Sequence, residues 1–521
     1  MTRMKHIIAT DFYNYTKCKY RVYMDKNTDP QDGNKLNYFL QLLWQNGTTH
    51  EEKAIKYFKE QKDKTFAELP TNDTVNDEVL KQIAEQTYLY MKNGINFIYQ
   101  GVLLRSGQDS LFEQIPAFIG RPDILMRVKG KSVFGDFTYT PVDIKIGSGL
   151  EENDWGKPRP SQAYMAQMNF YALLLEDIIK QPVKEGYIFN ARKQFVKYQL
   201  APHSDSLQNI LVKIKKMTSG FSEKSEPVIS GVCGLCPWQN NCRALAEKKN
   251  DLTLLFYLGE KMKYGFYEIG IYSIEELATA DIIKLLPQIE NAKRKKFFYP
   301  SVNDNLIKRL ITRAQLYLQE KNGAGAGAKF YIIYRKPDFP KTEKEIYYDI
   351  EDDPFGEFIY MHGFWIVEKN KEPYYHMFTA TREKTEQEIA EKLWDFFAEN
   401  KGVPIYHYAS HEKNVCKKLM EKYNLKKDVY DSVFGSNGSA IDLYQWITEN
   451  TDWPLTSYGL KAIAKYTGFD WSADDARGAI SIAWYYDYLN GNDAMMDKIL
   501  TYNKEDCMAT AHLKNWLENN V

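Results

Sequence analysis

The sequence is poor in cysteine and has no long apolar runs. Six cysteines among 521 residues are too few for a disulfide scaffold. No stretch is apolar for the roughly 18 residues that a membrane helix needs, and residues 1–11 lack the apolar stretch and cleavage site of a secretory signal. These absences predict a cytoplasmic protein without a membrane partner. The sequence also lacks a Walker-type Gly-x4-Gly-Lys-Ser/Thr loop, which argues against ATP hydrolysis by this chain.

Charge is nearly balanced overall but unevenly distributed. The chain has 68 Lys and Arg against 69 Asp and Glu, and 44% of its residues are hydrophobic, which predicts folded domains rather than disorder. Residues 341–521 hold 20 basic and 31 acidic residues, which leaves 48 basic and 38 acidic residues in 1–340. A cationic first part suits a polyanion such as nucleic acid, although a solvated lysine-rich surface explains the count equally well.

The hydrophobic pattern predicts a multidomain α/β protein with three parts. Residues 1–247 have an α/β order with one mixed sheet, residues 248–328 predict a helical connector of helix-hairpin-helix character, and residues 329–521 form a second α/β domain. The connector ends in the Gly/Ala-rich linker 322–328. The expected elements of the first part are a helix over 35–61, strands over 123–128 and 132–146 that turn at 129–131, a helix over 161–179 and a hairpin over 186–200. Those of the last part are strands over 345–351, 358–367 and 374–379, then a helix, a strand over 403–408 and further helices.

Acidic and basic side chains stand at the ends of two predicted strands in the first part. Asp123 opens one strand, and Asp143 and Lys145 lie near the end of the next, so the two aspartates can meet at one sheet edge. Alternate residues of a strand share a face, which puts a carboxylate that can hold Mg²⁺ or Mn²⁺ beside an ammonium that can orient water. An isolated Asp-x-Lys more often marks only a polar strand end.

Three further side chains strengthen this interpretation. His50 on the first long helix offers an imidazole ligand, and Gln167 and Tyr171 lie one turn apart on a later helix. Each has an ordinary structural explanation by itself. Together with the strand-end groups they predict a metal site for phosphodiester hydrolysis.

Four cysteines predict a second kind of metal centre. Cys233, Cys236 and Cys242 form a C-x2-C-x5-C array, and Cys18 lies far upstream. Sulfur ligands suit a [4Fe-4S] cluster or structural Zn²⁺, and the spacing alone does not choose between them. Such a centre would close a long loop of chain. Cys416 and Cys507 are expected to be small buried residues.

A second set of acids occurs in the last part. Asp349 and Glu351 share one face of an apolar strand, an arrangement that is costly unless cations pair with them. Tyr502 and Asp506 lie one turn apart on a predicted helix. The acid pair of the strand together with the tyrosine and acid of the helix indicates a metal site more specifically than either pair alone.

The first part resembles the RecB-type branch of the PD-(D/E)XK nucleases, which have a restriction-endonuclease-like fold and include AddB-type helicase-nucleases and CRISPR adaptation nucleases. The resemblance implies that His50, Asp123, Asp143 and the Ile144 backbone carbonyl bind the divalent metal. It implies that Lys145 assists the water and that Gln167 and Tyr171 form the QxxxY element of that branch. It also favours a [4Fe-4S] cluster over zinc at the four cysteines.

The last part resembles the DEDDy branch of RNase H-like 3′-to-5′ exonucleases. The resemblance implies that Asp349, Glu351 and Asp506 bind two Mg²⁺ ions and that Tyr502 orients the attacking water. Tyr406-His-Tyr-Ala-Ser-His-Glu412 occupies the place where that branch carries an Asn and an Asp, so Glu412 is the candidate fourth acid, with Asp442 as the fallback.

The order of these parts resembles a family of RecB-like nucleases over essentially the whole chain. It implies a two-site, Mg²⁺- or Mn²⁺-dependent exodeoxyribonuclease that acts on single-stranded DNA or DNA ends in repair, recombination or defence. The first site would work from 5′ ends and the second from 3′ ends. A helicase would be a partner in trans. The alternatives are an RNA-directed exonuclease and a nucleic-acid-binding factor in which one or both sites are silent.

Overall fold

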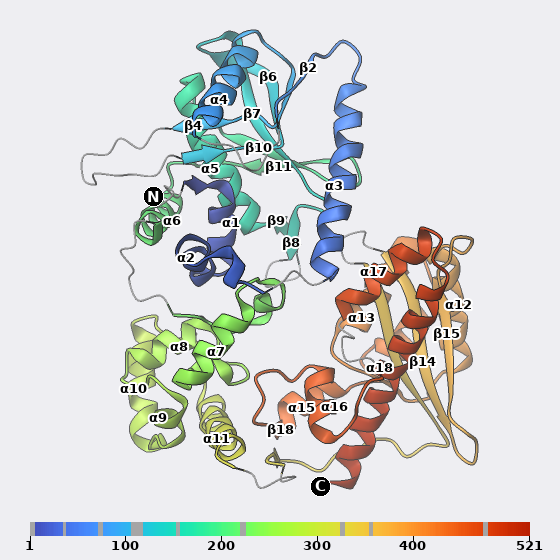
Figure 1. Ribbon diagram of the computed structural model, residues 1–521. Helices are drawn as coiled ribbons and strands as arrows, with labels where there is room; N and C mark the ends of the chain where they lie inside the picture. Colours follow the sequence, from blue (N-terminus) through green and yellow to red (C-terminus); the bar gives the residue numbers. More distant parts are fainter. Residues whose placement is uncertain are drawn as a thin grey trace. The chain divides into compact units, whose positions relative to one another are not determined.

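The computed structural model of the protein describes residues 6–34, 38–70, 77–105, 118–152, 157–218, 226–323, 329–353, 358–472 and 478–520. The chain divides into two compact units, Met1–Cys242 and Arg243–Val521 (Figure 1). Residues 324–328 of the predicted linker lie outside the described residues. The division into three domains stays a prediction. None of the helices within the described ranges is long and apolar enough to cross a bilayer.

The first unit is built around a six-stranded mixed sheet with the strand order β11-β10-β7-β6-β3-β2. Its central pair, β6 and β7, is antiparallel, and β10 runs parallel to β7. The elements of this unit are β1 (Ile7–Ile8), α1 (Ala9–Lys17), α2 (Lys19–Asn27), α3 (Tyr38–Lys59), β2 (Phe66–Glu68), α4 (Asp77–Lys92), β3 (Phe97–Tyr99), β4 (Leu103–Arg105), β5 (Phe118–Gly120), β6 (Ile124–Ser132), β7 (Gly135–Ile144), β8 (Leu150–Glu152), β9 (Pro158–Pro160), α5 (Gln162–Ile179), β10 (Glu185–Phe189), β11 (Phe195–Gln199) and α6 (Asp205–Thr218), and α7 (Gln239–Lys249) crosses into the second unit.

Two hydrophobic clusters cover this sheet. In the larger one, α1 packs on α5 through Phe12 and Phe170, whose ring centroids are 4.4 Å apart. In the smaller one, Phe58 of α3 packs on Phe97 and Phe189 from two strands. The sheet is therefore held between helices that carry candidate site residues.

The predicted turn between the two central strands was wrong in position. The strand pair is confirmed, but β6 continues to Ser132, which pairs with Gly135, so the chain reverses at residues 133 and 134 rather than at 129–131. Gly130 adopts a positive φ of 159° within an irregularity of the ladder between Lys129 and Ser132. Glycine permits such a bulge without ending the strand.

The second unit contains a five-stranded sheet with the strand order β15-β14-β13-β16-β17. β13, β14 and β15 form an antiparallel meander, and β13, β16 and β17 are parallel. The predicted strands and their order are confirmed. The elements of this unit are α8 (Glu260–Tyr267), α9 (Ile274–Ala278), α10 (Ile282–Arg294), α11 (Asp304–Lys321), β12 (Ile332–Ile333), β13 (Lys344–Asp353), β14 (Phe358–Glu368), β15 (Tyr374–Thr379), α12 (Glu386–Glu399), β16 (Ile405–His407), α13 (His411–Tyr423), α14 (Lys427–Phe434), β17 (Ala440–Asp442), α15 (Leu443–Asn450), β18 (Thr451–Asp452), α16 (Leu460–Thr467), α17 (Gly478–Leu489) and α18 (Ala494–Asn519).

The alternation of β13 decides where its acids lie. Ile346, Tyr348 and Ile350 belong to the cluster formed with α12, α13 and α14, whereas Tyr347 packs with α15, α16 and α18 on the other face. Asp349 and Glu351 share the face of Tyr347 because side chains alternate along a strand. The two acids therefore face α18.

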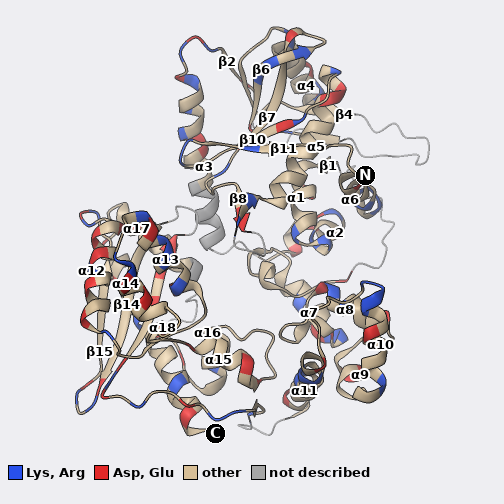
Figure 2. Cartoon of the chain, turned by 180° about the vertical axis from the view of Figure 1, so that it is seen from behind, with Lys and Arg blue, Asp and Glu red and all other residues tan. Residues whose placement is uncertain are grey.

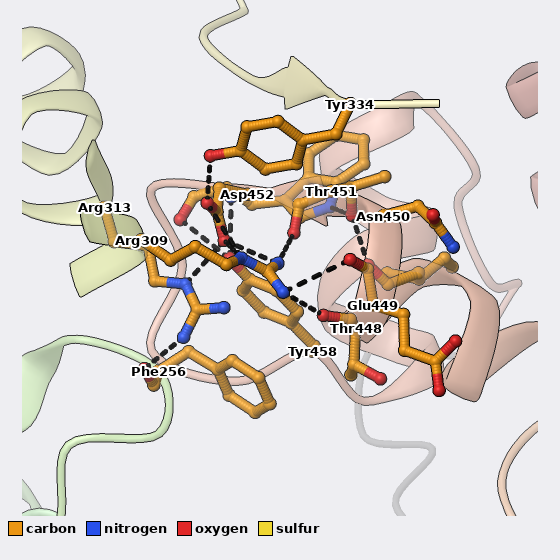
Figure 3. A network of polar contacts seen from close by, with 12 residues as sticks. Phe256, Arg309, Arg313, Tyr334, Thr448, Glu449, Asn450, Thr451, Asp452 and Tyr458 are labelled. Carbon is orange, nitrogen blue, oxygen red and sulfur yellow. Dashed lines mark hydrogen bonds and ion pairs between the residues drawn. The ribbon is translucent and has the colours of Figure 1, made fainter. Parts of the chain in front are cut away.

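The helix α11, which precedes this sheet in the chain, packs against β18 within the second unit. Arg309 and Arg313 of α11 both reach the fully buried Asp452 of β18 (Figure 3). Basic and acidic residues are interspersed along the helices of both units (Figure 2).

Candidate active sites

Three acids from distant parts of the second unit converge at one point. Asp349 and Glu351 lie on β13 and Asp506 lies on α18, and ligand oxygens of all three lie within 4.8 Å of one another. Among the residues that the structure describes, this is the one group of three or more His, Cys, Asp or Glu side chains gathered so closely. Glu351 and Asp506 are buried, at 5% and 7% exposure.

Burial and neighbouring acids raise the proton affinity of Asp349 and Glu351. Burial, followed by Asp506 and Glu351, raises the pKa of Asp349 well above its usual value. Burial and Asp506 raise the pKa of Glu351 to about 8. Three carboxyl groups in this setting cannot all ionise near neutral pH unless cations compensate them. The cluster therefore has the charge and the ligand chemistry of a divalent metal site.

Asn503 connects two of these acids and was missed by the sequence analysis. Its Nδ2 donates to Asp349 Oδ2 at 2.8 Å and to Glu351 Oε1 at 3.4 Å, while Tyr375 donates to its Oδ1 at 2.8 Å. Gly363 packs closely against Asn503. A Cβ at position 363 would stand only 1.6 Å from Asn503 Oδ1. The available signal was helical spacing, since Asn503 and Asp506 lie three residues apart on α18.

Tyr502 also lies at the acid cluster. The Tyr502 hydroxyl donates to Asp506, and burial, followed by the nearby acids, raises the pKa of this phenol. Lys461 of α16 donates to the same hydroxyl at 2.7 Å, and its Nζ stands 4.2 Å from the ring centroid. Trp471 donates to Asp506 Oδ1 at 2.7 Å. Lys461 and Trp471 were not predicted.

The candidate fourth acid lies near this cluster but outside it. Glu412, in the first turn of α13, is 3% exposed and close enough to Asp349 to contribute to its raised pKa. Its Oε2 is 3.4 Å from Nδ1 of His407. The fallback, Asp442, accepts from the backbone N–H groups of Ala409 and Gln445 and caps α15. Of the two, Glu412 is the one that contributes to the raised pKa of Asp349.

The strand-end groups of the first unit also meet. The backbone N–H of Ile144 donates to Asp123 Oδ2 at 2.7 Å, and the backbone N–H of Asp123 lies 3.3 Å from Asp143 Oδ1. Lys145 Nζ stands 3.5 Å from Asp123 and 3.3 Å from Asp143. Asp143 is 1% exposed, and burial, partly opposed by Lys145, raises its pKa to about 6.

The predicted amide and phenol lie beside this pair of aspartates. Gln167 Nε2 donates to Asp143 Oδ2 at 2.8 Å and to the Tyr171 hydroxyl at 3.0 Å. Tyr171 in turn donates to the carbonyl of Arg121 at 3.2 Å. The two side chains orient the Asp143 carboxylate, because α5 presents both toward the same strand end.

His50 and its neighbour complete the surroundings of this pair. His50 hydrogen-bonds the backbone of Lys145, and its Nε2 is buried without a hydrogen-bond partner. Glu51, which was not predicted, accepts from Tyr99 at 2.9 Å and from Gln100 at 3.3 Å. Gln100 also donates to Asp123 Oδ1 at 3.3 Å. The position of Glu51 next to His50 was the only sequence signal for this third carboxylate.

The four predicted cysteines line one cavity of about 300 Å³ in the first unit. Burial, followed by Cys236, raises the pKa of Cys242 to about 12, and Cys18 and Cys233 add to that shift. The donor set is that of a thiolate metal centre. Cys416 and Cys507 are fully buried elsewhere.

Comparison with known proteins identifies one part of the chain. Residues 346–518 match the RNase_H superfamily. A search of curated proteins found no match. The matched region contains the cluster of Asp349, Glu351 and Asp506. The second unit therefore carries an RNase H-like domain with an acidic cluster suited to Mg²⁺, which supports a metal-dependent nucleic-acid hydrolase.

Proposed function

We propose that the RNase H-like domain is a 3′-to-5′ exonuclease that hydrolyses phosphodiester bonds in single-stranded DNA or at DNA ends. The observation that carries this proposal is the meeting of Asp349, Glu351 and Asp506 from β13 and α18 in a domain that matches the RNase_H superfamily. Without cations, the proton affinities of Asp349 and Glu351 are raised. This supports metal binding, because the negative charge of buried carboxylates needs positive charge beside it.

The residues around the cluster have distinct roles in this proposal. Asp349, Glu351 and Asp506 hold divalent cations, with Glu412 as a fourth acid, and when bound these cations activate water and offset charge on the phosphate. Tyr502, fixed by Lys461, orients the attacking water. The water oxygen adds to phosphorus and gives up one proton, the bond to the leaving 3′-oxygen breaks, and that oxygen takes up one proton.

The first unit is proposed to be a PD-(D/E)XK nuclease with its own site and to work from 5′ ends. Asp123, Asp143, His50 and the Ile144 carbonyl would hold the metal, and Lys145 would orient water. Two features support this: Lys145 lies within 3.5 Å of both aspartates, and His50 has a buried Nε2 without a hydrogen-bond partner. Gln167 and Tyr171 would keep Asp143 oriented. A helicase in trans would supply unwound strands.

The cysteine-lined cavity is proposed to hold a [4Fe-4S] cluster that staples the first unit. Four sulfur donors around a cavity of about 300 Å³ suit either an iron-sulfur cluster or Zn²⁺, and the resemblance of the first unit to RecB-type nucleases favours the iron-sulfur cluster. An anaerobically purified sample should be brown and contain iron; a colourless sample with stoichiometric zinc contradicts the assignment.

The decisive experiment measures Mg²⁺- and Mn²⁺-dependent degradation of end-labelled single-stranded DNA and RNA. Asp349→Asn should abolish release of nucleotides from 3′ ends, and Asp143→Asn should abolish the second activity without affecting the first. Asp470→Asn, which removes an exposed carboxylate of the same unit, is the matched control and should retain both. Preference for RNA would support the RNA-directed alternative. Absence of any hydrolysis by metal-loaded wild type would leave a binding factor.

A further inference from the structure

Lys461 of α16 lies against the phenol that the proposed mechanism uses to orient water. Its Nζ donates to the Tyr502 hydroxyl at 2.7 Å. Burial raises the pKa of Glu351 and that of Asp506, and the positive charge of Lys461 partly opposes both rises. Lys461 therefore acts on the acid cluster as well as on the phenol, although it comes from a different helix.

Two aromatic rings hold the Lys461 ammonium in this position. Its Nζ stands 4.2 Å from the ring centroid of Tyr502 and 5.7 Å from that of Trp471. Attraction between a cation and an aromatic face is strongest where water is excluded. The Trp471 indole also donates to Asp506 Oδ1 at 2.7 Å. Trp471 therefore contacts both ends of a chain of three polar groups, which are Lys461, Tyr502 and Asp506.

The chemistry of these groups fixes the direction of each hydrogen bond in the chain. A lysine ammonium has three donors and no acceptor, so the Tyr502 oxygen must accept from Lys461. The single phenolic proton is donated to the Asp506 carboxylate. The second lone pair of the Tyr502 oxygen remains, and only a donor can bind to it. A water molecule at this oxygen must therefore donate one of its protons, which turns its own lone pairs away from Tyr502.

We propose that Lys461 is a positioning residue that sets the orientation of the attacking water through Tyr502. By donating to the hydroxyl, it keeps the Tyr502 proton directed at Asp506 and leaves the second lone pair for a proton of the water. A lone pair of the water then faces the phosphorus. Without the ammonium, the phenol can rotate and donate to the water, which occupies the lone pair that attack requires. The inference rests on the proposed function for the reaction and adds the direction of each hydrogen bond.

The test measures Mg²⁺-dependent hydrolysis of 5′-labelled oligothymidylate by the full chain. Lys461→Met keeps most of the apolar side chain but removes the donor. It should lower kcat about 10- to 100-fold at unchanged KM, the loss expected for one hydrogen bond from a charged group. Lys461→Arg is also donor-only and should keep most of the turnover. Lys465→Met makes the same change at an exposed position one turn later on α16 and should behave as the wild type does.

A double-mutant cycle with Tyr502→Phe separates this role from a general effect of charge. Tyr502→Phe removes the hydroxyl through which Lys461 acts, so Lys461→Met should cause little further loss of turnover in that background. The same coupling is measurable without metal or substrate. In EDTA, Lys461→Met should lower the midpoint of thermal unfolding more in the wild type than in Tyr502→Phe, because the hydrogen bond exists only when both partners are present.

Three results would overturn the inference and leave the proposed function intact, since the wild type still hydrolyses the strand in each. Equal losses of turnover on Lys461→Met with and without the Tyr502 hydroxyl would show that the ammonium acts by charge alone. A raised KM at unchanged kcat would show that it holds the strand, and wild-type kinetics of Lys461→Met would show that it has no role in the reaction. Absence of hydrolysis by the metal-loaded wild type would instead remove the proposed function, and the inference with it.

Discussion

Replacing Gly363 with alanine should disturb the acid cluster without changing any of its ligands. The added Cβ would stand 1.6 Å from Asn503 Oδ1 and 2.7 Å from the Tyr375 hydroxyl, whereas such contacts are not normally shorter than 3.0 Å. Asn503 would therefore have to move by about 1.4 Å, the difference between those two distances. Its bonds of 2.8 Å to Asp349 and from Tyr375 would be lost.

The expected effect is large for a change of one methyl group. With Mg²⁺ bound and Asp349 ionised, the bond to Asp349 contributes about 1.5–3 kcal/mol and the neutral bond from Tyr375 about 1 kcal/mol, so unfolding of the second unit should become about 2.5–4 kcal/mol easier. Displacement of a positioning group by about 1 Å can lower turnover about 100-fold. Thermal unfolding and Mg²⁺-dependent release of nucleotides from labelled 3′ ends measure the two effects.

A double-mutant cycle decides whether the reasoning is correct. Asn503→Ala removes the atoms that the new Cβ would strike, so Gly363→Ala should cost much less stability in that background than in the wild type. Additive losses would refute the proposed clash. So would a Gly363→Ala variant with wild-type stability and turnover.

Three further predictions concern charge. In EDTA, the thermal stability of the second unit should fall as pH rises from about 4.5 towards 8, because the pKa of Glu351 is raised to about 8 in the folded state. Mg²⁺ should reverse this fall. A stability that does not change with pH would contradict the prediction. Arg309→Met should make unfolding in urea about 3 kcal/mol easier, because Asp452 is fully buried and loses one of its two cations; a change below about 1 kcal/mol would show that Arg313 suffices. Trp471→Phe should raise the Mg²⁺ concentration for half-maximal hydrolysis about tenfold, because Asp506 loses a donor at 2.7 Å, and an unchanged Mg²⁺ titration would contradict that role.

Much of the fold was predictable because its strands have strong local patterns. The alternating, β-rich stretch around Tyr347 and the apolar stretch around Phe364 indicate strands regardless of the rest of the chain. The reversal between β6 and β7 was misplaced because Gly130 was interpreted as a turn residue. In the folded unit it lies in an irregular part of the ladder, where pairing with β7 outweighs the local preference for a turn.

The candidate sites were predictable where chemistry and spacing coincide. Asp349 and Glu351 alternate on one strand, and Tyr502 and Asp506 lie one helical turn apart, so each pair is visible in the sequence. Lys461 and Trp471 belong to other segments, and only tertiary packing brings them to the cluster. Gln100, which bridges Glu51 and Asp123, is unpredictable for the same reason.

The acid cluster joins β13 to α18, two elements that lie far apart along the chain. A ribosome completes Asp349 and Glu351 well before it reaches residue 506, so a growing polypeptide holds an unfinished metal site. Until α18 docks on the sheet, the three acids cannot jointly bind a cation. The order of synthesis thus delays completion of this site until α18 has been made.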